Sequence, residues 1–207
     1  MKKNRILLLI LLLLSVISVF AGISMSIFTF FGKGNTNNVI ETGRIIFSYS
    51  DALKKGNGID IKGAMPMKDE DGIVLSQENE YFDFSVSATT TSTDIAYEIV
   101  VNKDETSTLP DDMVKIYLTE IDGNEEKVVP LLEKEILTYD KLKDTTNKLL
   151  TGKTVYYGEV KAGEVAYGKK FRLRMWIKDV DSTTFDYETI FNKNYKVRVN
   201  VAAVGSK

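Results

Sequence analysis

Two clusters of acidic residues are the first candidates for chemistry in this sequence. Asp69, Glu70 and Asp71 precede Gly72, and a second cluster follows near the C-terminus. The second cluster consists of Asp179, Asp181, Asp186 and Glu188. Clustered carboxylates in loops suit a hard cation such as calcium, but neither spacing is that of an EF-hand loop. We therefore interpret both clusters as solvated turns, and the sequence assigns no metal, cofactor or catalytic site.

Basic and aromatic residues form a second candidate site. Arg172, Arg174 and Trp176 share one face of a predicted strand, and Lys196 and Arg198 would extend that face from another strand. An exposed patch of this kind would bind an anionic polymer or a glycan. The alternative is that the crossover segment or neighbouring long side chains cover the patch.

Two missing residue types exclude most enzyme classes. The chain contains neither Cys nor His. This removes thiol nucleophiles, disulfides, Ser-His-Asp triads and imidazole metal ligands. A glycosidase that uses only carboxylates stays conceivable, but nothing in the sequence selects one pair from 29 acidic residues. We therefore predict that the protein is not an enzyme.

The N-terminus predicts export from the cytoplasm. Residues 6–32 carry no charge and follow the basic residues Lys2, Lys3 and Arg5. This is the pattern of a signal peptide or a signal anchor, which we assign to residues 1–32. If it is uncleaved, residues 6–31 are long enough to form a transmembrane helix and anchor the protein in the membrane. The basic tip then stays on the cytoplasmic side, and the rest of the chain faces outward.

The remaining chain predicts a short linker and one domain. Residues 33–43 are rich in Gly and Asn and form the predicted linker, and residues 44–207 form the predicted extracytoplasmic domain. Without Lys2, Lys3 and Arg5, 24 basic residues face 29 acidic residues, and they alternate in sequence. Nucleic acid is therefore not an expected partner.

Alternating apolar and polar residues predict a mainly β domain. The expected strands cover residues 45–50, 81–88, 95–101, 114–121, 154–161, 170–178 and 195–203. In the fifth of these, Val155, Tyr157 and Val160 alternate with an offset that indicates a β-bulge. Only residues 131–150 look helical. We predict a two-sheet β-sandwich of jelly-roll or immunoglobulin-like type, with a short helical crossover and the hydrophobic export helix in front.

Segments at both ends resemble one family. A small-residue site at Ala21-Gly22 is followed by the apolar segment 26–31, which reads SIFTFF. The Asn/Thr-rich turn 35–43 leads into the first expected strand, and residues 196–203 end the chain in an apolar strand. This arrangement resembles the TasA and camelysin family, whose members carry a SipW-type signal peptide. The resemblance implies a β-sandwich subunit of a biofilm matrix that polymerises into fibres by lending an N-terminal strand to its neighbour. The peptidase activity described for camelysin does not carry over, because His is absent.

Two functions follow as hypotheses. The first is a structural protein of the cell surface, secreted or anchored, that self-associates into fibres and contacts matrix components. Cleavage near Ala21 or Ser26 would free the apolar segment 26–31 to complete a sheet edge in another subunit. The second is a monomeric, membrane-anchored binding module for an extracellular glycan or protein.

Overall fold

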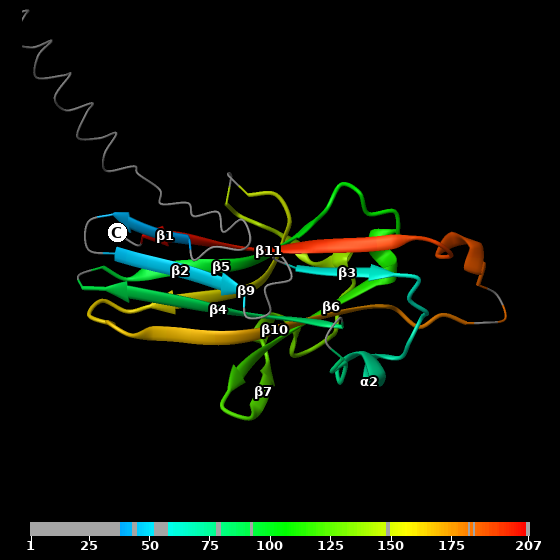
Figure 1. Cartoon of the computed structure of the whole chain (residues 1–207), viewed down its shortest axis with the longest axis horizontal. Coiled ribbons are helices and arrows are strands. Elements are labelled where there is room, and N and C mark those ends of the chain that lie inside the picture. The colour runs from blue at the N-terminus through cyan, green and yellow to red at the C-terminus, as the bar shows by residue number, and fades with distance from the viewer. Residues whose placement is uncertain are drawn as a thin grey trace, which may run out of the picture.

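The chain forms two antiparallel β-sheets that pack face to face (Figure 1). The computed structural model describes residues 38–42, 45–51, 58–77, 80–91, 93–147, 150–181, 183 and 185–205. The six-stranded sheet has the order β1-β2-β4-β10-β6-β7. Its strands are β1 (Asn38–Thr42), β2 (Ile45–Asp51), β4 (Tyr81–Thr90), β10 (Tyr167–Ile177), β6 (Val114–Asp122) and β7 (Glu125–Val128). These sheets confirm the predicted mainly β architecture.

The second sheet has five strands in the order β3-β11-β5-β9-β8. Its strands are β3 (Gly58–Lys62), β11 (Asn194–Gly205), β5 (Ile95–Lys103), β9 (Lys153–Val160) and β8 (Lys143–Asp144). The edge strand β3 pairs only with residues 194–198 of β11. The chain therefore changes sheets between β2 and β3.

Alternation along the strands explains the core between the sheets. In β10, Phe171, Leu173 and Met175 are at most 1% exposed and face the second sheet. From that sheet, Tyr195 and Val197 of β11 are fully buried and pack in the same core. Burying such side chains stabilises the fold by about 1.5–3 kcal/mol each. The apolar faces predicted for both strands are confirmed.

A β-bulge in β9 decides which of two neighbouring tyrosines enters the core. The ladder with β5 pairs Ile99 with Tyr156 and Val100 with Thr154, so Val155 is the additional residue. Tyr156 is therefore 8% exposed and packs in the core, whereas Tyr157 is 49% exposed. A bulge in this strand is confirmed, but it lies at Val155 and not between Tyr157 and Val160. The prediction that Tyr157 points inward was wrong, because the extra residue at Val155 places Tyr156 on the core face.

The predicted helical crossover is mostly extended. Within residues 131–150, the described chain has two single 3-10 turns, Pro130–Leu132 and Tyr139–Lys141, and the strand β8. Between the two turns the backbone runs beside β6, where the Ile116 N–H donates to the Leu137 carbonyl at 3.1 Å. The α-helical turn of the described residues is α2 (Asp69–Gly72), which lies outside the predicted crossover.

The N-terminal predictions fall mostly outside the described residues. This holds for the segment 6–31, and no helix in the described part of the chain is long and apolar enough to cross a membrane. β1 lies within residues 33–43, for which the sequence predicts a linker, and pairs antiparallel with β2. These five residues therefore extend the six-stranded sheet.

Candidate functional site

The basic and aromatic residues singled out in the sequence lie on the outer face of the six-stranded sheet. The ladder places Arg174 between Tyr81 of β4 and Tyr117 of β6, and Trp176 beside Lys115 of β6. These residues form what we call the basic floor, together with Arg172. The floor consists of Tyr81, Lys115, Tyr117, Arg172, Arg174 and Trp176.

Lys196 and Arg198 do not extend this floor. Both lie on β11 in the five-stranded sheet, so they belong to the opposite layer of the sandwich. Arg198 instead donates to Asp104 at 2.6 Å. The predicted extension was wrong. Alternation indicates which side chains of one strand share a face, but it does not indicate which sheet the strand belongs to.

A segment that we call the strap, residues 64–77, covers one end of the basic floor. It includes α2, whose Gly72 lies against the Trp176 indole, and a Cβ added to Gly72 would meet ring atoms at 2.3 Å. The indole Nε1 donates to the Asp69 carboxylate at 3.3 Å, and Trp176 is 1% exposed. The Arg174 Nε donates to the Leu75 carbonyl at 2.7 Å. Trp176 is therefore not an exposed stacking platform in this structure.

The edge strand β7 lies beside β6 in the same sheet, and one of its side chains reaches over the middle of the floor. Its Glu126 accepts from Arg174 at 2.6 Å and 3.1 Å, from Arg172 at 2.9 Å and from the Thr119 hydroxyl at 2.9 Å. Arg174 is only 4% exposed. Arg172 also forms a two-pronged pair with Asp83, and its guanidinium lies 4.1 Å from the centre of the Tyr81 ring. The cations of the floor are thus paired with carboxylates.

The pKa values of these groups follow from the pairing. Hydrogen bonds from Arg174 lower the pKa of Glu126, against a smaller opposing effect of burial. Hydrogen bonds to Asp83 raise the pKa of Arg172. Both groups are therefore charged at neutral pH, and the network is held by opposite charges.

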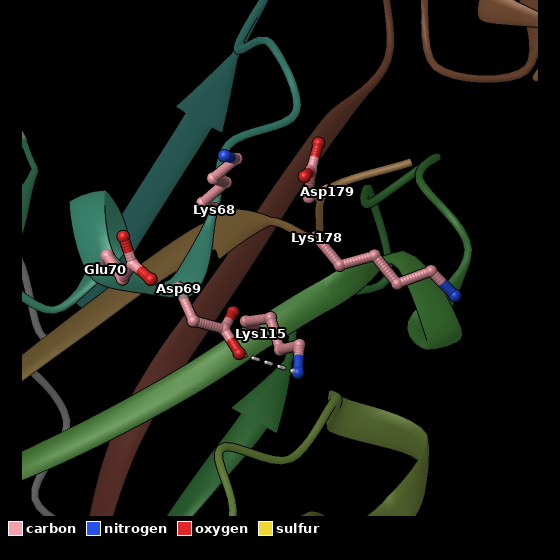
Figure 2. A pocket seen from close by; sticks show the side chains of 6 residues that line it. All are labelled: Lys68, Asp69, Glu70, Lys115, Lys178 and Asp179. Carbon is pink, nitrogen blue, oxygen red and sulfur yellow. Dashed lines mark hydrogen bonds and ion pairs between the residues drawn. The ribbon is translucent and has the colours of Figure 1, made fainter. Parts of the chain in front are cut away.

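A polar hollow of about 390 Å³ lies beside the strap, at one end of the basic floor (Figure 2). Its lining consists of Lys68, Asp69, Glu70, Lys115, Lys178 and Asp179. Lys115 pairs with Asp69 at 3.3 Å and donates to the Ile136 carbonyl at 2.7 Å. Figure 2 shows the amines of Lys68 and Lys178 pointing in different directions. The hollow therefore lies where α2 contacts β6 through Asp69 and Lys115. Its charged side chains do not converge on one point.

The acidic clusters do not gather into a metal site. Within the described part of the chain, no three carboxylates are placed to hold an ion together. Asp181 and Asp186 accept from backbone N–H groups two residues ahead, those of Thr183 and Glu188. These contacts are typical of polar residues that stabilise their own turns.

A group that sequence reasoning missed lies between the sheets, at the end where β10 begins. The Lys169 amine donates to Glu120 at 2.7 Å and to the Tyr156 hydroxyl at 3.2 Å. The hydroxyls of Tyr97 and Tyr167 share a hydrogen bond of 2.6 Å. We call these five residues the tyrosine-lysine cluster. The alternation of β10 indicates this cluster, because Tyr167 and Lys169 lie on the same face of the strand as the buried Phe171.

The tyrosine-lysine cluster is buried at its base and accessible at its rim. Tyr97 and Tyr156 are at most 8% exposed, whereas the side chains of Lys169 and Glu120 are 29% and 32% exposed. Burial, with the hydrogen bond to Tyr167, raises the pKa of Tyr97. Burial alone would lower the pKa of Lys169, but hydrogen bonds to Glu120 and Tyr156 outweigh it and raise this pKa. The cluster therefore presents a fixed ammonium, a carboxylate and neutral phenols.

Comparisons with known proteins give no family for this chain. No protein-family model matches it, and no curated protein matches it. Among solved structures, it is similar to TmCBM61 in complex with β-1,4-galactotriose, at 13% identity and a TM-score of 0.25, over 77% of this chain and 88% of that chain. It is also similar to the CBM22-2 xylan-binding domain of Paenibacillus barcinonensis Xyn10C, at 6% identity and a TM-score of 0.20, over 80% and 94% of the two chains. Both TM-scores lie below 0.5, so neither similarity establishes a shared fold or ligand.

Proposed function

We propose that this protein is an exported, non-catalytic module that binds a neutral glycan at the cell surface. The tyrosine-lysine cluster carries the proposal. Its ammonium donates hydrogen bonds and its carboxylate accepts them, and the two groups stand 2.7 Å apart at a partly exposed rim. Each hydroxyl of a sugar can both donate and accept a hydrogen bond. Two neighbouring hydroxyls can therefore accept from the ammonium and donate to the carboxylate, while both groups keep their charge.

Packing holds the cluster in place before a ligand arrives. The Tyr156 ring lies 5.1 Å from the Phe171 ring in the core, and the Tyr97 ring lies 5.9 Å from the Tyr156 ring. Groups on strands that are locked by such packing lose little conformational entropy on binding. Tyr167 adds an aromatic side chain at the rim, and its hydroxyl is fixed by Tyr97.

Binding to neutral polysaccharides tests this proposal. Affinity electrophoresis of the full-length protein in galactan, xylan and glucan gels should show retardation by at least one of them. We expect Glu120→Gln and Lys169→Met to raise the dissociation constant for that polymer at least about tenfold. This corresponds to a loss of about 1.4 kcal/mol of binding free energy. The matched controls are Glu125→Gln and Lys127→Met, because that pair is 3.8 Å apart and more than 70% exposed. Equal effects of both sets, or no retardation by any polymer, would refute the site.

The edge of β11 favours a second candidate function, a subunit that accepts a strand from its neighbour. Residues 197–205 of β11 pair with β5 on one side, but on the other side β3 ends opposite Arg198. No strand of the described residues pairs with residues 199–205 on that side. Residues 199–205 carry no charge and no proline, two features with which proteins often protect a sheet edge.

The apolar segment 26–31 is the strand that we propose for this edge. The test is the assembly size of the protein after export, measured by sedimentation and electron microscopy. Fibres that disappear when Phe28 and Phe30 are both changed to Ser would support the assembly. Unchanged fibres, or a protein that is monomeric with either sequence at high concentration, would exclude this second function and leave the glycan site untouched.

A further inference from the structure

Acidic elements cover a basic surface on the outer face of the six-stranded sheet. The basic floor provides three cations, Lys115, Arg172 and Arg174, and three aromatic rings. The strap and β7 place two carboxylates on these groups: Asp69 on Lys115 and Trp176, and Glu126 on both arginines. A third carboxylate, Asp83 of β4, pairs with Arg172 from within the sheet. The carboxylates thus occupy the positions where an anionic ligand would bind.

We infer that the basic floor is a covered binding site for an anionic polysaccharide, and that the strap competes with this ligand. The site is separate from the tyrosine-lysine cluster, which lies between the sheets. Its ligand is an acidic sugar polymer because the floor combines cations with aromatic rings. Arginine and lysine bind carboxylate groups, whereas Trp and Tyr rings stack on the apolar faces of sugar rings.

The way the strap is held makes it displaceable. Apolar contacts hold the strap weakly: Ala64 is partly buried against the core, no apolar side chain of residues 64–77 is fully buried, and Met65 and Val74 are more than 60% exposed. The buried residue of α2 is Gly72, which has no side chain to lose from the core. The Asp69 carboxylate and backbone contacts also attach the strap, such as the 3.0 Å bond from the Met67 N–H to the Ile177 carbonyl. A polymer that offers several carboxylates can replace the contacts of Asp69.

The spacing of the floor suits a polymer better than a single sugar. Rows of the floor follow the ladder, with Arg174 between Tyr81 and Tyr117, and Arg172 in the adjacent row. Neighbouring strands lie about 4.8 Å apart, so the rings and cations of one row recur at that interval. An extended chain lying across the strands would therefore meet several of these groups in succession.

Variants of the strap that differ by one contact test the inference. Asp69→Ala removes the carboxylate that touches the floor, and Asp71→Ala removes an equal charge from an exposed position on the same helical turn. Polygalacturonate is the probe, and dextran is the uncharged comparator. The fluorescence of Trp176, which is the one tryptophan of the chain, reports whether the floor is covered.

We expect Asp69→Ala to tighten polygalacturonate binding by the full-length protein about tenfold relative to Asp71→Ala. Its tryptophan emission should also shift to longer wavelength and be quenched more strongly by acrylamide. Adding Lys115→Met to Asp69→Ala should reverse most of the gain, because the floor then lacks a cation. A strap with a purely structural role would weaken or leave unchanged the binding in all of these variants.

Three results would overturn the inference. The first is equal affinity of the Asp69 and Asp71 variants for polygalacturonate. The second is an equal gain with dextran, which would show that charge is not recognised. The third is a gain that survives Lys115→Met, which would place the binding site elsewhere. Loss of glycan binding through the tyrosine-lysine cluster would leave each of these comparisons intact.

Discussion

Replacing Glu126 by Gln should destabilise the folded protein far more than the same change at the preceding residue. Glu126 is the shared acceptor of Arg172, Arg174 and Thr119. With Gln in its place, the guanidinium of Arg174, which is 4% exposed, keeps the Leu75 carbonyl but loses its counter-charge. Glu125 is 76% exposed and pairs only with Lys127, at 3.8 Å, in the described structure.

The size of the effect follows from burial. Breaking a buried ion pair from one side costs about 3–5 kcal/mol, because a charge is left without a partner. The side chains of Glu126 and Arg172 are 28% and 22% exposed, and Arg172 keeps its pair with Asp83, so the cost should lie at or just below the lower end of that range. We expect Glu126→Gln to lower the free energy of unfolding by about 2–3 kcal/mol and Glu125→Gln by less than about 0.5 kcal/mol.

Urea unfolding followed by far-UV circular dichroism measures both values. The pH dependence gives a second test, because the folded state lowers the pKa of Glu126. The stabilisation is then complete above the unfolded pKa of Glu, about 4.3, and is lost as the pH falls through the lower folded value. The difference between the wild type and Glu126→Gln should therefore shrink below about pH 4. Equal destabilisation by both variants at pH 7 would refute the role of this network, as would a difference that stays constant down to pH 3.

Three glycine substitutions give further predictions, all measured by chemical unfolding. Gly72→Ala should cost about 1–3 kcal/mol, because the new Cβ would lie 2.3 Å from the Trp176 ring. A red-shifted tryptophan emission should accompany this loss, and an unshifted emission would contradict the contact. Gly158→Ala should cost a similar amount, because its Cβ would lie 2.2 Å from the Tyr97 ring. Gly168→Ala on β10 serves as the control, because nothing lies within 4 Å of the added atom; we expect no loss, and a cost above about 1 kcal/mol would show that the backbone itself requires glycine there.

The strands with one buried face could be predicted from the sequence because their pattern is local. Phe171 and Leu173 repeat with a period of two and are buried. The short edges could not be predicted in this way. β7 consists of Glu125 to Val128, three charged residues before one apolar residue, and it forms because the turn at Gly123 returns the chain to β6.

The sequence also could not predict that the basic floor is covered. The side chain that bonds the Trp176 indole is Asp69, 107 residues earlier. Alternation along β10 gives Arg172, Arg174 and Trp176 a common face, but it does not reveal that a distant segment lies on that face. The tyrosine-lysine cluster was missed for a related reason: Lys169 reads as a surface residue, and its partners Glu120 and Tyr156 come from two other strands, β6 and β9.

The bulge at Val155 has a consequence for how this protein can change during evolution. Point substitutions in β9 alter one face of the sheet at a time, because each position has a fixed side. Deletion of Val155 would instead remove the bulge and leave both faces unchanged, because Thr154 already pairs with Val100 and Tyr156 with Ile99. Insertion or deletion of one residue at a regular position of β9 would move every residue on one side of the change to the other face. Position 155 is therefore the place where β9 can lose a residue while Thr154 keeps its bond to the buried Glu98 on β5. Among related chains, a β9 that is shorter at this point should therefore preserve the pair of Thr154 and Glu98.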